Sequence, residues 1–177
     1  MKKILFMLAS FLLLTGCAHV ISEESRNMVD ASIQFQGLRA DPDSYVGKYV
    51  MLGGTVAGVQ NDKDGSQLEV VQSPLDSDEL PEEVSHSSGG RFLAITPRFL
   101  DPVVYKTGRR VTVVGQVQGK KVLPIDRIEY TYPVISIREI HVWSKSELEP
   151  PQYPPPGYYY DPYWWGPPYW WHRRPYF

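Results

Sequence analysis

The middle of the chain alternates between apolar residues and polar or small residues with a period of two. Val50, Leu52 and Val56 show the alternation most clearly. Five segments have this pattern: residues 49–56, 67–72, 91–95, 110–117 and 133–143. Successive side chains of a strand point to opposite faces, so the alternation is typical of strands with one buried face. We therefore expect five strands around one core.

Turn sequences and one long loop separate these strands. NDKDGS at 61–66 predicts a turn after the first strand, and GKK at 119–121 predicts one before the last. Between the second and third strands lies a long acidic stretch, residues 72–90, and loops of that length are usually functional or mobile. The alternation of the last segment changes phase at Arg138 and Glu139, which indicates a β-bulge.

A short repeat precedes two of the strands. DPDSYVGKYVMLGGTV begins at Asp41, and DPVVYKTGRRVTVVGQV begins at Asp101. Asp-Pro is typical of a helix start, and a glycine five or six residues after the proline, Gly47 or Gly108, permits the left-handed conformation that ends a helix. Each copy therefore predicts one helical turn that leads into a strand. Asp41 and Asp101 are also a candidate carboxylate pair, but capping accounts for both.

The order of these elements predicts the fold class. Five strands, with one helical turn before the first and another between the third and fourth, match the OB-fold, a partly open Greek-key barrel. We predict a mainly β protein: a small OB-like five-stranded barrel with short helical turns, followed by a disordered C-terminal tail rich in proline and aromatic residues. A small β-sandwich is the alternative, because one sequence does not show strand order.

The N-terminus, MKKILFMLASFLLLTGC, has the features of a lipoprotein signal peptide. Two lysines precede an apolar run of 11 residues, Ile4 to Leu14, which is shorter than the roughly 20 residues of a membrane span. The run ends in LTGC, and Cys17 is the only cysteine. We expect cleavage between Gly16 and Cys17 and a covalent lipid on the Cys17 thiol. An ordinary signal peptide with a chance cysteine, or a buried N-terminal helix, is the alternative.

Lipidation at Cys17 would set the organisation of the whole chain. We expect a signal peptide at 1–16, a lipidated tether at 17–36, the OB-like domain at 37–148 and the aromatic tail at 149–177. A lipidated lone cysteine leaves none for a disulfide, and two or more acyl chains hold a protein stably at a membrane. Ala18 follows the cysteine. By resemblance to lipoprotein sorting in bacteria with two membranes, alanine there favours the outer membrane, with the domain facing the periplasm.

Several ordered motifs carry a resemblance to a known family. DPDSYVGKYVMLGG, LEVVQSPLD, GRFLAITPRFLDPVVYKTGRRVTVVGQVQG and YPVISIREIHVW stand behind the LTGC motif, within residues 37–143. Together they resemble the Slp family of bacterial outer-membrane lipoproteins. The resemblance implies an outer-membrane lipoprotein with a general link to starvation and stress, and it supplies no catalytic residues. The aromatic tail is not among these motifs.

The tail, PPQYPPPGYYYDPYWWGPPYWWHRRPYF, holds seven tyrosines, four tryptophans and nine prolines. Proline favours extended polyproline II backbone, and tyrosine and tryptophan suit a protein, sugar or membrane surface. We expect the tail to contact an envelope protein, a glycan or the membrane surface through these candidate residues: Tyr158, Tyr159, Tyr160, Trp164, Trp165, Trp170, Trp171, Arg173 and Arg174. A low-complexity end without a specific partner is the alternative.

Net charge and motif spacing argue against nucleic-acid binding, catalysis and metal binding. From Cys17 onward, 16 basic and 20 acidic residues give a net charge of −4, so we expect no nucleic-acid partner. No catalytic constellation, metal site or cofactor other than the Cys17 lipid is predicted. The candidates that we rank below structural roles are a Ser85–His86–Glu83 set, a weak Ca²⁺ site in the acidic loop, the dispersed histidines, and Tyr130 with Tyr132 as a binding face rather than core cover. The sequence thus predicts a non-enzymatic envelope protein, or alternatively a module that binds an oligosaccharide or peptide on the OB-like face.

Overall fold

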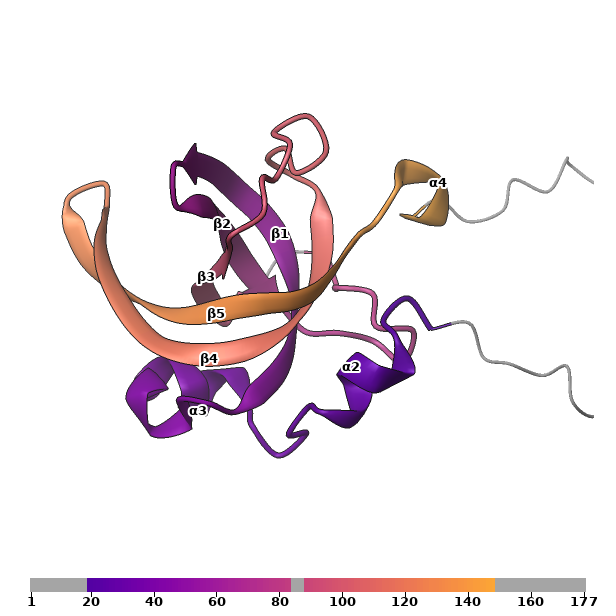
Figure 1. Ribbon diagram of the computed structural model, residues 1–177, viewed down its shortest axis with the longest axis horizontal. Helices are drawn as coiled ribbons and strands as arrows, with labels where there is room; N and C mark the ends of the chain where they lie inside the picture. The colour runs from indigo at the N-terminus through magenta and orange to yellow at the C-terminus, as the bar shows by residue number, and fades with distance from the viewer. Residues whose placement is uncertain (1–18, 84–87, 149–177) are drawn as a thin grey trace, which may run out of the picture.

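Five strands close into a barrel in the computed structural model, which describes residues 19–83 and 88–148 (Figure 1). The strands are β1 (Tyr49–Asp62), β2 (Gly65–Ser73), β3 (Gly90–Thr96), β4 (Arg110–Ile125) and β5 (Ile128–Val142). Their order around the barrel is β1-β2-β3-β5-β4. β3 and β5 pair in parallel, and the other neighbouring pairs are antiparallel. This order confirms the predicted OB-like barrel and excludes the sandwich for the described residues.

Short helices flank the barrel. They are α2 (Glu23–Asn27), α3 (Phe35–Ala40), the 3₁₀-helix η2 (Pro42–Tyr45) and α4 (Lys145–Leu148). The core is aliphatic, and α3 covers one end of it with Phe35, whose ring meets Phe92 edge-on at 6.2 Å. Figure 1 shows α3 below the curved β4–β5 pair, and α2 and α4 toward the right of the view. The predicted five-strand core is therefore present, with its apolar alternation pointing inward.

The internal repeat forms the pairing of β1 with β4. The N–H of Gly47 donates to the carbonyl of Val117, and the N–H of Gly108 donates to the carbonyl of Val56, both at 2.9 Å. Both glycines have positive φ, +86° and +88°, which explains why glycine stands at each. Val56 and Val117 are equivalent positions of the two copies, so each copy ends its turn against the strand of the other. The repeat thus corresponds to an approximate twofold arrangement within the barrel.

Two local predictions were wrong. The helical turn expected between the third and fourth strands is not a helix: Asp101 starts only a hydrogen-bonded turn, in which the carbonyl of Asp101 accepts from Tyr105 (2.9 Å) and its carboxylate accepts from Val103 (2.8 Å). The turn expected at 119–121 is instead part of β4. Gly119 has φ +114° beside a register shift, so its glycine bends the strand and the hairpin turn comes later, at Asp126.

Two other local predictions are confirmed. The register of β5 against β4 jumps from Glu139 to Ile137, so Arg138 is the extra residue of the expected bulge. The first Asp-Pro turn forms η2, with proline at its start. The Asp41 carboxylate accepts a hydrogen bond from the hydroxyl of Ser44 and not from a backbone N–H. Both aspartates therefore stabilise turns, as the capping interpretation expects, although only Asp101 caps a backbone group.

Glycines at equivalent repeat positions should be intolerant of any side chain. A Cβ at Gly54 would lie 2.2 Å from the carbonyl oxygen of Val71, and one at Gly115 would lie 2.3 Å from that of Ser136. Because backbone must move to relieve these contacts, we expect Gly54→Ala and Gly115→Ala each to lower the free energy of unfolding by about 2 kcal/mol. Gly58→Ala, where a Cβ meets nothing within 4 Å, is the matched control and should be near neutral. Urea unfolding midpoints that coincide for all three variants would contradict this packing.

Candidate functional site

The functional residues predicted from the sequence lie mostly outside the described part of the chain. Gly16 and Cys17 precede residue 19, and the candidate tail residues follow residue 148: Tyr158, Tyr159, Tyr160, Trp164, Trp165, Trp170, Trp171, Arg173 and Arg174. Their predicted roles remain predictions. The structure instead shows where the chain enters and leaves the barrel.

The described chain packs against the barrel from its first residues, close to the predicted lipidation site. His19 is only two residues after Cys17, and Ile21 is already 1% exposed. The N–H and hydroxyl of Ser22 donate to the two carboxylate oxygens of Glu139 on β5, at 3.0 and 2.6 Å. Glu24 pairs with Arg138. The tether expected at residues 17–36 therefore packs against the barrel from Ile21 onward.

Glu79 of the acidic loop fixes this entry segment. Its carboxylate accepts from the N–H of Ile21 (3.2 Å) and lies 3.2 Å from Nε of Arg26 and 3.7 Å from Nδ1 of His19. Glu79 is 60 residues from His19, so the residues around His19 do not indicate this partner. The carboxylate is largely buried, so the guanidinium of Arg26 and the N–H of Ile21 offset the cost of removing its charge from water.

Two buried hydrogen bonds through Thr112 connect the acidic loop to Trp143, the residue that follows β5. The hydroxyl of Thr112 donates to the carbonyl of Glu79 (2.7 Å) and accepts from Nε1 of Trp143 (3.0 Å). Leu75 also lies on this face, since a Cβ at Gly53 would sit 2.3 Å from its methyl group. The acidic loop is therefore a packed cover on the outer face of β1 and β4 over residues 74–83.

Other charged residues of the acidic loop form contacts within the loop and with β4. The Asp76 carboxylate accepts from the N–H groups of Asp78 and Leu80, both at 2.9 Å. Glu83 approaches Arg110 at 3.8 Å. Its proposed companions Ser85 and His86 lie in the undescribed residues 84–87. Within residues 19–83 and 88–148 there is no group of three or more residues able to hold a metal ion, and no helix is long and apolar enough to cross a membrane.

The chain leaves the barrel on the side where it enters. β5 ends at Val142, and α4 follows beside it. Glu147 accepts from the N–H of Ser144 (2.6 Å) and lies 3.3 Å from Nε2 of His141, and these contacts, with Ser144 first, hold the pKa of the Glu147 carboxyl below its ordinary value. Since Ser22 is bound to Glu139 of the same strand, the described chain begins and ends on one side of the body (Figure 1).

The face of β2 and β3, which binds ligands in many OB-folds, is covered by the β4–β5 hairpin. Tyr132 donates its hydroxyl to Glu69 (2.9 Å), which also holds Arg91 at 2.6 Å. The hydroxyl of Tyr130 accepts from the N–H of Arg91 (2.8 Å), and the two tyrosine rings meet edge-on at 4.7 Å. Tyr132 is 3% exposed, which supports its interpretation as cover, whereas Tyr130 is only half-buried and its role stays a prediction. A ligand on this face would have to displace them.

The contribution of the buried Tyr132 hydroxyl to stability should be measurable as a dependence on alkaline pH. Burial first, and then the hydrogen bond to Glu69, raise the pKa of Tyr132 from 10.0 to about 12. A raised folded-state pKa gives stability that is complete below the unfolded value and is lost as the pH rises from about 10 to about 12. We expect the urea midpoint to fall between about pH 9 and about pH 11, and to fall less in Tyr132→Phe. An equal fall in both chains would show that the Tyr132 hydroxyl is not part of the cover.

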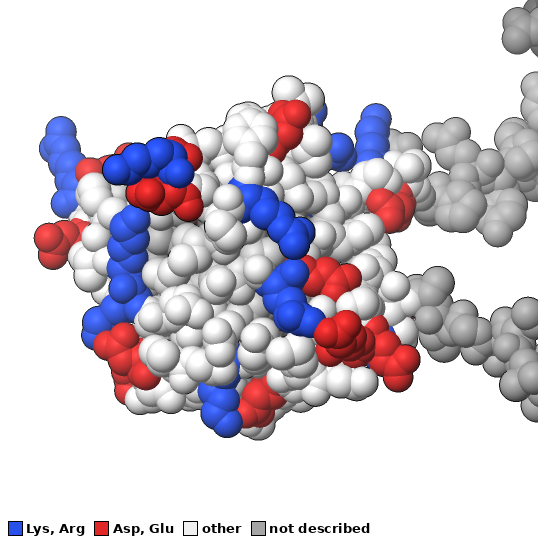
Figure 2. All heavy atoms as spheres, in the orientation of Figure 1, with Lys and Arg blue, Asp and Glu red and all other residues white. Residues whose placement is uncertain are grey.

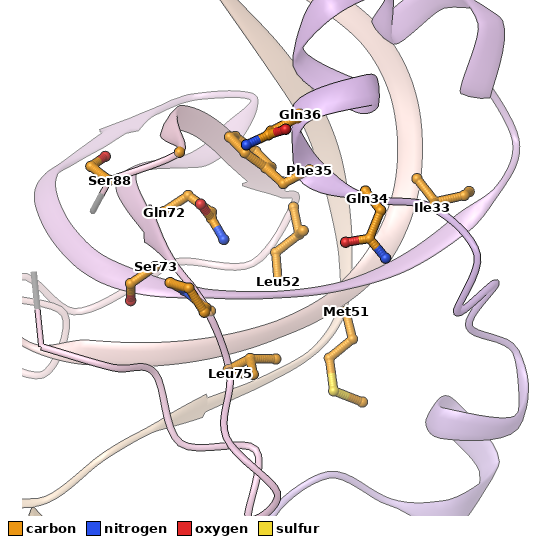
Figure 3. Close-up of a pocket in the computed structure, with 13 residues that line it drawn as sticks. Ile33, Gln34, Phe35, Gln36, Met51, Leu52, Gln72, Ser73, Leu75 and Ser88 are labelled. Atoms are coloured by element: carbon orange, nitrogen blue, oxygen red, sulfur yellow. The ribbon is translucent and has the colours of Figure 1, made fainter.

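A pocket opens at the lower edge of the barrel, where α3, β1 and the end of β2 diverge (Figure 3). Its volume is about 580 Å³. The lining is uncharged and mixes apolar groups with amides and hydroxyls: Ile33, Gln34, Phe35, Gln36, Met51, Leu52, Gly53, Gln72, Ser73, Pro74, Leu75, Ser88 and Gly89. Ser73 is 1% exposed, and its hydroxyl has no hydrogen-bond partner in the part of the chain that the structure describes. Buried hydroxyls are usually paired, so this one is an unpaired polar group within the wall of the pocket.

Comparison with known proteins supports the family resemblance and extends it beyond residues 37–143. A model of the outer membrane lipoprotein Slp family matches residues 14–170. This match includes the LTGC motif and most of the tail, although the motifs that carried the resemblance ended at residue 143. The tail was therefore set apart from the family's sequence too strictly.

Two relatives from Escherichia coli (strain K12) match over most of the chain. Outer membrane protein Slp is 32% identical over 149 residues, which cover 84% of this chain and 78% of that protein. A protein named uncharacterized lipoprotein YeaY is 32% identical over 143 residues, covering 80% and 73%. Among solved structures, a small single-stranded DNA-binding protein from Streptomyces coelicolor matches with 13% identity and a TM-score of 0.33, over 54% of this chain and 94% of that one, and carries no argument about function. The family model and both relatives agree, and the chain belongs to the Slp family of outer membrane lipoproteins.

Proposed function

We propose that the protein is held by a lipid on Cys17 at the periplasmic face of the outer membrane, where it has a structural or interaction role. The observation that carries this proposal is the short connection between the lipidation site and the barrel. Ile21 is buried four residues after Cys17, and four extended residues span at most about 14 Å. The barrel would therefore rest against the membrane instead of moving on a long tether.

The tail is the proposed contact with a partner. It begins after α4, on the side where the chain comes from Cys17, so its tyrosines and tryptophans would act close to the membrane. Its proline content favours an extended backbone that a protein groove can bind, and Arg173 and Arg174 suit phosphate or carboxylate groups of a glycan. The family's general link to starvation and stress predicts that this contact matters most in non-growing cells.

Removal of the tail tests this role. We expect a chain truncated after Glu149 to keep its lipid and its membrane fraction but to lose crosslinks to envelope proteins and retention on peptidoglycan or lipopolysaccharide. A photo-crosslinker at Trp165 should capture the partner, and one at Val122 on the β4–β5 hairpin is the matched control. Unchanged crosslinks and unchanged retention after truncation would rule out the tail as the contact.

A second candidate function is binding of an uncharged oligosaccharide or short peptide in the pocket of Figure 3. The uncharged lining, which places amide side chains such as Gln34 and Gln72 beside apolar groups, favours it. Met51→Arg places a charge in the pocket and should abolish such binding, while the truncation after Glu149 should leave it intact. The opposite result, in which truncation abolishes binding and Met51→Arg does not, would assign the activity to the tail.

A further inference from the structure

The loop between β3 and β4, residues 97–109, exposes three large apolar side chains at its tip. Phe99 is 70% exposed, Val103 is 78% exposed and Val104 is 43% exposed. Single exposed apolar residues are common on protein surfaces, but three on one short loop are a candidate interaction surface. We call these three residues the apolar tip.

The base of this loop is held firmly, so the tip cannot fold back into the core. Leu100 is buried. Its N–H donates to the hydroxyl of Ser66 (2.8 Å), and its carbonyl accepts from the side-chain amide of Asn61 (3.0 Å). The turn at Asp101 fixes Val103 through its N–H, and the hydroxyl of Thr107 donates to the carbonyl of Ala57 (3.0 Å). A rigid base presents the tip outward at low entropic cost.

The charges beside the tip are basic. Arg98 and Lys106 are exposed on the two flanks of the loop. Asp101 is also exposed, and its carboxylate accepts from the N–H of Val103, but residues 97–109 hold three basic residues against this one acidic residue. An apolar tip with basic flanks suits a phospholipid surface, because acyl chains accept the apolar groups while headgroup phosphates attract the cations.

The base of the loop lies near the β5 residues that hold the entry segment. Phe99 and Leu100 line a hollow of about 450 Å³ together with Arg138 and Glu139 of β5. Arg138 and Glu139 in turn hold Glu24 and Ser22 of the entry segment. Figure 1 shows the loop at the top of the view with α4 to its right, and Figure 2 shows uncharged surface together with acidic and basic groups at the top of the same view.

We propose that the apolar tip inserts into the phospholipid headgroup layer of the leaflet that carries the Cys17 lipid, and so fixes the orientation of the barrel on the membrane. This inference rests on the proposed anchoring and adds a second contact to it. A lipid anchor alone leaves the body free to rotate about one point, whereas two contacts restrict that rotation. The bond to lipid is non-covalent and reversible.

Depth measurement tests the orientation. The lipidated full chain, with its lipid on Cys17 verified by mass, is reconstituted into vesicles of phosphatidylethanolamine and phosphatidylglycerol. A fluorophore is placed at Val103→Cys or, as matched control, at Val122→Cys on the β4–β5 hairpin, which is also exposed. We expect quenchers in the headgroup layer to quench the Val103 position several-fold more strongly. Equal quenching at both positions in vesicle-bound, lipidated protein would overturn the inference, while failure to carry lipid would count against the anchoring alone.

A vesicle-binding experiment measures how much the apolar tip contributes to membrane affinity when the lipid on Cys17 is absent. In full-length mature chains that also carry Cys17→Ser, Phe99→Ser with Val103→Ser removes the tip, and Val122→Ser with Ile128→Ser removes an exposed apolar pair of the hairpin. The tail is present in both, so its contribution cancels. We expect the tip variant to bind the same vesicles about tenfold more weakly than the hairpin variant, which corresponds to about 1.4 kcal/mol. Equal vesicle binding, including the case in which the tip instead docks on a protein, would refute insertion into lipid.

Discussion

Cys17→Ser is expected to abolish lipid attachment and to move nearly all of the protein out of the outer-membrane fraction. The serine hydroxyl does not replace the cysteine thiol in thioether formation, and cleavage before residue 17 depends on the modified cysteine. Without its acyl chains the protein keeps only the weak contacts of the loop and the tail. Labelled fatty acid incorporation and membrane fractionation measure the effect. Undiminished labelling of the Cys17→Ser chain would show that the lipid is elsewhere.

Ala18→Asp is the matched control for this prediction. It leaves Cys17 in place, so lipid labelling should continue at the level of the unaltered chain. By resemblance to lipoprotein sorting, aspartate at this position should shift the protein to the inner membrane. The pair of variants therefore separates attachment from sorting: one loses the lipid, and the other keeps the lipid in a different membrane. Loss of labelling in Ala18→Asp would mean that the two steps are not separable here.

Thr112→Val is expected to destabilise the barrel by about 3 kcal/mol. The side chain is fully buried, and its hydroxyl is bound to both the carbonyl of Glu79 and Nε1 of Trp143. Valine has nearly the same shape but pairs with neither, so two buried polar groups would lose a partner at about 1–3 kcal/mol each. Urea unfolding measures the loss. Hydrogen exchange should also rise in residues 74–83 and near Ile21, because Glu79 joins them.

Thr131→Val is the matched control on β5. Thr131 is exposed and lies opposite Val122 of β4, so the same change of side chain should alter the free energy of unfolding by less than about 0.5 kcal/mol. If both variants unfold at the same urea concentration, the hydrogen bonds of Thr112 contribute nothing to stability and the acidic loop is held by its other contacts.

The strands could be predicted from the sequence because each has one face in the core. Val50, Leu52 and Val56 alternate with less buried neighbours, and the repeat at Asp101 gives the same signal in β4. The bulge at Arg138 was visible for the same reason, since an extra residue reverses the alternation. Local pattern therefore suffices wherever burial alternates along one strand.

Contacts between distant segments could not be predicted in this way. Glu79 meets Ile21 across 58 residues and Thr112 across 33, and nothing in the residues around either partner indicates the other. GKK predicted a turn because two lysines follow Gly119, yet the hairpin continues because Tyr132 and its neighbours on β5 pair with this part of β4. The pocket beside Ser73 depends on three elements that meet only in the fold.

The mass of the mature N-terminus tests the central claim most directly. Protein purified from the membrane fraction is digested, and the N-terminal peptide is analysed intact by mass spectrometry. We predict a peptide that begins at Cys17 and carries a thioether-linked diacylglycerol with an amide-linked acyl chain. A peptide that begins at Met1, or an N-terminal Cys17 without lipid, would contradict the account.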